Sequence, residues 1–272
     1  MSSRSNGIGT VFSSFWRHRQ LVLQMVRREI VGRYRGSLLG LLWSFVNPVL
    51  MLAVYTFVFS IVFQARWGKG GEDKYEFALV LFAGLIVFNL FSECVSRAPG
   101  LILANVNYVK KVIFPLEILP WVTLGSALFH AGISLAVLLL FLGAIGSAIH
   151  WTVLLLPIVV LPLLLLIMGL SWLLASVGVF VRDVGQFINM VMTILMFMSP
   201  IFYPASALPE SVRGYLFLNP LTFIIEQARD VVIWGTLPDW GGLAAYSVIA
   251  MAAAWAGLFW FAKTRKGFAD VL

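Results

Sequence analysis

The residues best suited to acid–base or metal chemistry are few and scattered along this sequence. The three histidines, His18, His130 and His150, lie far apart, without a His-Glu-x-x-His spacing or paired carboxylates on one helix face. The single cysteine, Cys94, has no second cysteine for an internal disulfide and no neighbouring metal-ligand pattern, so a packing role is predicted. The sequence therefore indicates no metal site and no catalytic centre of these kinds.

Phosphate chemistry is not indicated either. A Gly-x-x-x-x-Gly-Lys-Ser/Thr loop is absent from the sequence, and the nearest glycine cluster lies at residues 68–71. We therefore expect that this chain does not hydrolyse ATP and binds no cofactor of its own. His130 lies within an apolar stretch, where an ionisable group is costly. It is either a neutral hydrogen-bonded helix contact, which we favour, or a proton relay.

The composition points to a bilayer as the solvent for much of the chain. Hydrophobic residues make up 61% of the 272 residues and charged residues only 11%. Apolar runs of about 20 residues, the length of a helix that crosses a membrane, recur along the chain. Residues 153–168 are apolar on every face, which favours helices over the alternating strands of a membrane barrel. Six spans are predicted, at residues 38–63, 77–92, 119–145, 152–181, 187–202 and 241–262.

The distribution of lysine and arginine predicts the orientation of these spans. The N-terminal segment 1–37, the loop at 93–118 and the tail 263–272 are rich in basic residues, whereas residues 203–240 contain more acids than bases. Because cytoplasmic flanks retain positive residues, both termini are predicted to be cytoplasmic, on either side of a transmembrane domain at 38–262. The net charge of +7 then reflects topology rather than nucleic-acid binding, since the charges lie at membrane edges.

Two further segments have amphipathic patterns. Residues 21–35 place apolar side chains on one side of a helix and mostly arginines opposite, as in a helix that lies in the cytoplasmic interface. A merely basic flank is the alternative. Within residues 203–240, apolar groups alternate with Glu226, Arg229 and Asp230, which predicts short re-entrant helices, with a solvent-exposed cap as the alternative. The predicted fold class is an all-α membrane protein with six transmembrane helices, one interfacial helix and short re-entrant helices on the exported side.

Three segments carry a resemblance to a known family. They are residues 33–48 (RYRGSLLGLLWSFVNP), residues 107–120 (NYVKKVIFPLEILP), and the set formed by 182–183 (RD), 199–204 (SPIFYP) and 218–222 (LNPLT). In this order and at these topological positions, they resemble ABC-type permeases that export polysaccharides, the group containing O-antigen, capsule and teichoic acid exporters. Together they extend over most of the chain, and they do not identify the glycan.

The resemblance implies a permease subunit of an ATP-driven exporter in the bacterial inner membrane. Two copies of the chain would form the path for a lipid-linked polysaccharide, among membrane lipids. Two copies of a separate cytoplasmic ABC ATPase, which would hold ATP and magnesium, would bind beneath them. An ion-coupled carrier and a membrane scaffold of a glycan-synthesis complex are the alternatives.

Candidate site residues follow in three groups. Sugar rings stack on flat aromatic faces and bond to amides, which predicts a substrate path lined by Trp43, Asn47, Tyr55, Phe59, Phe88 and Asn89. Coupling to the ATPase is predicted at Asn105, Asn107, Tyr108, Lys110 and Lys111, and next at Arg182 and Asp183. The resemblance implies an exported-side gate at Phe202, Tyr203, Pro204, Asn219 and Pro220. The alternatives are lipid contact or helix packing for the rings, and a plain topological signal for the lysines.

Overall fold

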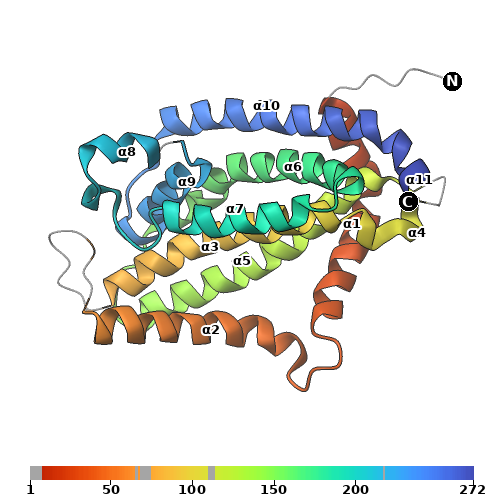
Figure 1. Ribbon diagram of the computed structural model, residues 1–272. Coiled ribbons are helices and arrows are strands. Elements are labelled where there is room, and N and C mark those ends of the chain that lie inside the picture. Colours follow the sequence, from red (N-terminus) through yellow and green to blue (C-terminus); the bar gives the residue numbers. More distant parts are fainter. Residues whose placement is uncertain (1–7, 65–66, 68–74, 110–113, 217) are drawn as a thin grey trace.

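The protein is a helical bundle in which most of the long helices run from one end of the molecule to the other (Figure 1). The computed structural model describes residues 8–64, 67, 75–109, 114–216 and 218–272. The long helices are α1 (Ile8–Arg33), α2 (Trp43–Tyr55, continued by a π-helix at Thr56–Val62), α3 (Glu76–Arg97), α5 (Leu119–Ala144), α6 (Leu156–Phe180), α7 (Val184–Met198) and α10 (Trp240–Thr264). The short helices are α4 (Val106–Val109), α8 (Glu210–Leu216), α9 (Pro220–Arg229) and α11 (Phe268–Val271).

The predicted class, an all-α membrane protein, is confirmed. Five helical stretches are long and apolar enough to cross a bilayer, namely Gly40–Val62, Glu76–Gly100, Leu116–Ala144, Trp151–Phe180 and Trp240–Val271. They correspond to five of the six predicted spans. The remaining one is α7, whose 15 residues reach only about 22 Å. In Figure 1, α7 nevertheless runs beside α3 and α6 between the same two ends.

The fifth predicted span, residues 187–202, was placed too far along the chain. The helix ends at Met198, because Ser199 adopts an extended conformation (φ −86°, ψ 149°) before Pro200. A residue before proline is disfavoured in the helical region, and proline itself has no N–H to donate. Phe202 therefore lies in a turn beyond the helix.

The second predicted span, residues 77–92, was too short at its C-terminal end. Helix α3 continues to Arg97 and so includes Glu93 within the helix. It lies at the centre of the bundle, with 78% of its most apolar window buried, and packs against α5, α6, α7 and α9. A charged residue on this central helix needs partners from its neighbours.

The interfacial segment predicted at residues 21–35 is part of the longer helix α1, which has a kink at His18 and ends at Arg33. Val22 and Met25 on its apolar side are 4% and 7% exposed, and α1 packs against α5. The apolar side is therefore buried on the bundle. The turn to α2 contains Gly36 (φ 86°) and Gly40 (φ 51°), conformations that residues with a side chain rarely adopt.

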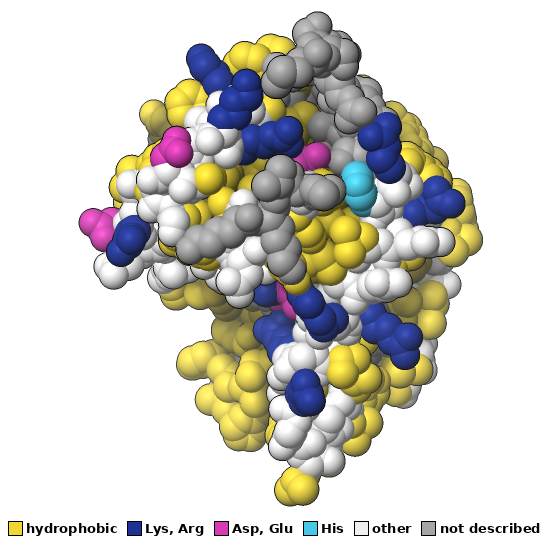
Figure 2. Space-filling model, turned by 90° about the vertical axis from the view of Figure 1, so that its right-hand side faces the viewer, with side chains coloured by type: hydrophobic (Ala, Val, Ile, Leu, Met, Phe, Trp, Pro, Cys, Tyr) yellow, Lys and Arg dark blue, Asp and Glu magenta, His cyan; other side chains and the backbone are white. Residues whose placement is uncertain are grey.

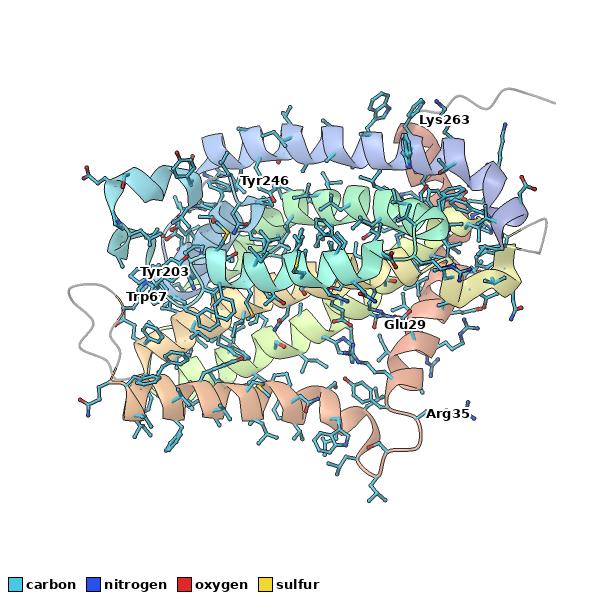
Figure 3. All side chains as sticks on the ribbon, viewed as in Figure 1. Glu29, Arg35, Trp67, Tyr203, Tyr246 and Lys263 are labelled. Atoms are coloured by element: carbon cyan, nitrogen blue, oxygen red, sulfur yellow. The ribbon has the colours of Figure 1, made fainter. Side chains whose placement is uncertain are left out.

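The two ends of the bundle differ in content. Helices α1, α4 and α11 meet at one end, which we call the α1 end, and α8 and α9 lie at the other, the α9 end (Figure 1). Arginine and lysine side chains are spread over the α1 end (Figure 2). Figure 3 shows Glu29, Arg35 and Lys263 toward this end, and Trp67 and Tyr203 at the α9 end.

Candidate functional site

A cavity with a volume of about 480 Å³ lies between α2, α3 and α5, and Arg33 at the end of α1 forms part of its wall. Its wall is rich in groups that donate or accept hydrogen bonds, which is unusual for the interior of a membrane bundle. The polar and charged lining residues are Arg33, Tyr34, Ser44, Asn47, Tyr55, Asn89, Ser92, Glu93, Ser96, Arg97, His130 and Ser134. We refer to this space as the polar cavity.

Three of the six predicted path residues, Asn47, Tyr55 and Asn89, line the polar cavity. Asn89 is an exposed position on a helix that is otherwise mostly buried, because it faces this opening. Phe88, one residue earlier, is 5% exposed and belongs to the hydrophobic core. Trp43 is the half-buried first residue of α2 and is not among the lining residues.

A cluster of charged and polar side chains closes the cavity toward the α1 end, with Glu93 at its centre. The Glu93 carboxylate accepts a hydrogen bond from Arg33 and lies 3.7 Å from Arg97 and 3.5 Å from Nδ1 of His130. Nε2 of His130 is 3.2 Å from the Tyr34 hydroxyl. The cluster thus joins the end of α1 to α3 and α5.

His130 makes polar contacts to Arg33 and Tyr34, as expected for a hydrogen-bonded helix contact, and the choice between this interpretation and a proton relay stays a prediction. The sequence did not predict the other members of the cluster as site residues, namely Arg33, Tyr34, Glu93 and Arg97. A usable signal was present: Asn89, Glu93 and Arg97 are spaced four residues apart, which places them along one face of a helix. It was missed because the predicted span ended at residue 92.

The cluster continues along α1 toward the cytoplasmic loop predicted at residues 93–118, which contains Asn105, Asn107 and Tyr108 and which we call the coupling loop. Arg97 also donates to Glu29, and Nη2 of Arg28 donates to the Tyr108 hydroxyl at 3.0 Å. A smaller cavity of about 240 Å³ lies beside these pairs and is lined in part by Asn105. Helix α1 therefore contacts both the polar cavity and the coupling loop.

The predicted coupling residues are placed at the α1 end. The Tyr108 ring stacks on Phe114, with centroids 4.2 Å apart and planes 9° apart, and Asn105 donates to the backbone carbonyl of Leu101. Asn107 is exposed. Arg182 and Asp183 are exposed in the turn between α6 and α7. Lys110 and Lys111 lie outside the described residues.

Aromatic rings gather at the α9 end, and Phe59 belongs to this group rather than to the polar cavity. Its ring stacks on Phe77 with centroids 5.2 Å apart and lies 6.4 Å from Phe202. Phe202 in turn stacks on Phe197 at 5.8 Å. The Tyr203 hydroxyl donates to the backbone carbonyl of Phe197 at 3.0 Å. The structure thus brings one predicted path residue together with two predicted gate residues.

The other predicted gate residues shape the start of α9. The Asn219 side chain accepts a hydrogen bond from the backbone N–H of Leu221 and donates to the Ser199 hydroxyl at 2.8 Å. It thereby caps the helix and ties it to the end of α7. Pro220 occupies the first turn of α9, where its missing N–H costs nothing, and Pro204 precedes a short 3₁₀ turn.

Metal ligation is not indicated in the part of the chain that the structure describes. No group of three or more His, Cys, Asp or Glu side chains is close enough there to hold an ion. Among the members of the Glu93 cluster, the carboxylates are already engaged by arginines. The chemistry that this arrangement offers is therefore recognition of a polar solute by hydroxyls, amides and charges.

Comparisons with known proteins agree with this picture. The chain is 31% identical to the O-antigen export system permease protein RfbA of Myxococcus xanthus over 94% of this chain and 96% of the relative. It is 24% identical to the polysialic acid transport protein KpsM of Escherichia coli, over 93% and 96% of the two chains. A capsule polysaccharide export inner-membrane protein, CtrC of Neisseria meningitidis, is 26% identical over 80% and 82%.

The match to a family profile covers most of the sequence. The profile described as ABC-2 type transporter matches residues 20–233, a range that contains the polar cavity, the coupling loop and α9. The resemblance drawn from the three sequence segments is confirmed. The chain belongs to the ABC-2 type transporter family.

Proposed function

We propose that this chain is the permease subunit of an ATP-driven exporter that moves a lipid-linked polysaccharide across the bacterial inner membrane. The relatives named above export O-antigen, polysialic acid and capsule polysaccharide, which supports this substrate class. The observation that carries the proposal is the polar cavity, because an apolar membrane bundle gains nothing from placing so many hydroxyls and amides around one opening unless a polar solute enters.

The cavity lining suits a sugar chain. Ser44, Ser92 and Ser134 offer hydroxyls that both donate and accept, and Asn47 and Asn89 offer amides. The ring of Tyr55 provides a flat apolar face for the C–H groups of a sugar. Each of these contacts is weak, so together they bind a glycan while still allowing it to move along the path.

The path is formed between two copies of the chain. Gln186, Asn189 and Thr193 are exposed and lie on one face of α7, at spacings of three and four residues. The Thr193 hydroxyl donates to the backbone carbonyl of Asn189, but lipid tails offer no hydrogen-bond partner for the amides of Gln186 and Asn189, whereas a second copy or a hydrated path does. We infer that this face of α7 points toward the partner copy and the solute rather than toward lipid.

The α1 end faces the cytoplasm, and the α9 end is the exported side. The arginine and lysine side chains at the α1 end (Figure 2) agree with the tendency of positive residues to remain cytoplasmic. A separate ABC ATPase binds at this end, near Tyr108 and Asn107, and supplies the ATP and magnesium chemistry. The contact between Arg28 and Tyr108 then connects the ATPase to α1 and, through Arg33, to the polar cavity.

Two experiments separate this function from its alternatives. A strain without the chain should still synthesise the lipid-linked polysaccharide but accumulate it inside, with the surface polysaccharide lost. Loss of synthesis would instead support a scaffold. In inside-out vesicles that contain the purified chain and its co-purified ATPase, uptake of the glycan should require ATP and should survive collapse of the ion gradients. Uptake that follows an ion gradient without ATP would support a carrier.

A further inference from the structure

At the α9 end, Arg229 lies fully inside the protein, with only 3% of its surface exposed. Its guanidinium donates three hydrogen bonds, from Nε to the carbonyl of Val80 at 2.9 Å, from Nη1 to that of Pro200 at 2.6 Å and from Nη2 to that of Ile201 at 3.2 Å. The three acceptors are backbone groups on α3 and on the turn after α7. One side chain of α9 therefore bonds to two other elements.

We propose that Arg229 is a positioning residue that fastens α3, the end of α7 and α9 into one rigid body at the α9 end. Arginine suits this role because its planar guanidinium directs several donors at fixed angles, so acceptors on separate elements can be bonded at once. Lysine presents a single charged nitrogen and cannot reproduce that pattern.

The surroundings of Arg229 are arranged for the cation. The Trp67 ring covers it, with the guanidinium carbon 4.5 Å from the ring centroid, a favourable cation–π distance. Burial lowers the pKa of Arg229 to about 9, although the nearby carboxylates of Glu226 and Asp230 oppose this shift, so the group remains charged at neutral pH. A buried charge held by neutral carbonyls is stable only while all of them stay in place.

Gly84 on α3 gives independent support. A Cβ atom added at Gly84 would lie 2.6 Å from Nη2 of Arg229 and 3.3 Å from a methyl group of Ile225. The helix thus lacks a side chain at the position where the guanidinium passes. The sequence predicted a short amphipathic helix with Arg229 among its charged residues, and the bonds to Val80 and Pro200 explain why this charged residue is buried.

A consequence for transport rests on the proposed function. If α9 moves only together with α3 and the end of α7, the exported end of the glycan path does not open by a movement of α9 alone. The α2 continuation lies against this body through Phe59, whose ring stacks on Phe77 of α3 at 5.2 Å and lies 6.4 Å from Phe202. That part of α2 is a π-helix, and only 11% of the most apolar window of the span Gly40–Val62 is buried, so α2 is held less firmly than the body around Arg229.

The fastening role can be tested on the purified complex in lipid nanodiscs, independently of transport. Thr222 of α9 is 1% exposed, and its hydroxyl is buried without a hydrogen-bond partner, so Thr222→Cys in a Cys94→Ala background is a mild reporter. Its reaction with a water-soluble maleimide measures how often α9 separates from the bundle. We expect Arg229→Met to raise the labelling rate at least about tenfold. Arg265→Met, which removes an arginine paired with Glu117 at the α1 end, should leave the rate within about twofold.

A second pair of variants keeps the test decisive if Arg229→Met does not assemble. Gly84→Ala should raise the labelling rate, because the new methyl group displaces the guanidinium. The matched control is Gly132→Ala on α5, where an added Cβ atom meets no described atom within 4 Å, and it should leave the rate within about twofold of the parent. Rates equal to the parent in both Arg229→Met and Gly84→Ala would overturn the proposal. So would a rate in Gly132→Ala that is raised as much as in Gly84→Ala. Because labelling needs no substrate, failure of the exporter proposal would leave these results unchanged.

Discussion

The two ends of the bundle hold their arginines in different ways. At the α1 end, the side chains of Arg33 and Arg97 are 51% and 43% exposed and pair with carboxylates. At the α9 end, Arg229 is buried and bonds only to backbone carbonyls. Half-exposed ion pairs exchange partners at little cost, whereas a buried cation that loses its hydrogen-bond acceptors is strongly destabilised. The α1 end is therefore suited to rearrangement during a transport cycle, and the body around Arg229 to staying fixed.

The largest effect should come from removing the fixed contact. Arg229→Met leaves the buried carbonyls of Pro200 and Ile201 without their donor, at about 1 kcal/mol or more each, whereas the carbonyl of Val80 keeps its bond within α3, so we expect a loss of about 2 kcal/mol or more in stability. Thermal unfolding of the detergent-solubilised protein measures it. A loss below about 1 kcal/mol would mean that the carbonyls find other donors and that the contrast between the ends is weaker than described.

Breaking the exchangeable cluster should cost less stability but affect transport. Glu93→Gln removes the carboxylate that Arg33 and Arg97 share, and we expect a loss of about 1 kcal/mol together with slower export. The matched control is Glu117→Gln, which breaks the pair with Arg265 at the same end of the bundle but outside the polar cavity. Equal export defects in both variants would remove the special role of Glu93.

A ring substitution in the polar cavity should change transport without changing stability. Tyr55→Leu removes a stacking face worth about 0.5–1.5 kcal/mol, so export should slow roughly two- to tenfold, whereas Tyr55→Phe keeps the ring and most of the rate. Surface polysaccharide and the amount of assembled permease are measured together. Wild-type export by the leucine variant would take Tyr55 out of the path.

The smallest effect is expected at the coupling loop. Tyr108→Phe loses the hydrogen bond from Arg28 but keeps the stacking on Phe114, so export should stay within about twofold of the parent. Tyr108→Leu loses both contacts and should loosen the ATPase, which co-purification with the permease detects. If the phenylalanine variant were as defective as the leucine variant, the link from Arg28 would matter more than the stacked ring.

The membrane-spanning helices could be predicted because each crossing of a bilayer needs about 20 apolar residues, and runs of about that length are visible in the sequence. The ends of these helices were harder to predict. Helix α3 continues through Glu93 because Arg33 and His130, from other helices, provide polar partners there. Such partners are brought together only by the fold. The end of α7 at Met198 was signalled locally by Pro200, a signal that the apolar run outweighed.

The site was predictable by residue type but not by position around and along each helix. Phe88 precedes Asn89 by one residue, a rotation of about 100°, which turns its ring into the core. Phe59 shares a face with Tyr55 but lies about 6 Å farther along the helix, which brings it to the aromatic rings of the α9 end. For Arg229, the sequence showed a charged residue at an amphipathic position, and its carbonyl partners come from segments far away in the chain.

The most direct test of the glycan path is photo-crosslinking from the polar cavity during export. A photoreactive phenylalanine derivative placed at position 89 faces the cavity, and the same residue at position 248, where Val248 is 69% exposed on α10, serves as the matched surface control. We expect an ATP-dependent adduct with polysaccharide at position 89 and none at position 248. Polysaccharide adducts at 248 but not at 89, or lipid adducts alone at both positions in an exporting strain, would contradict it.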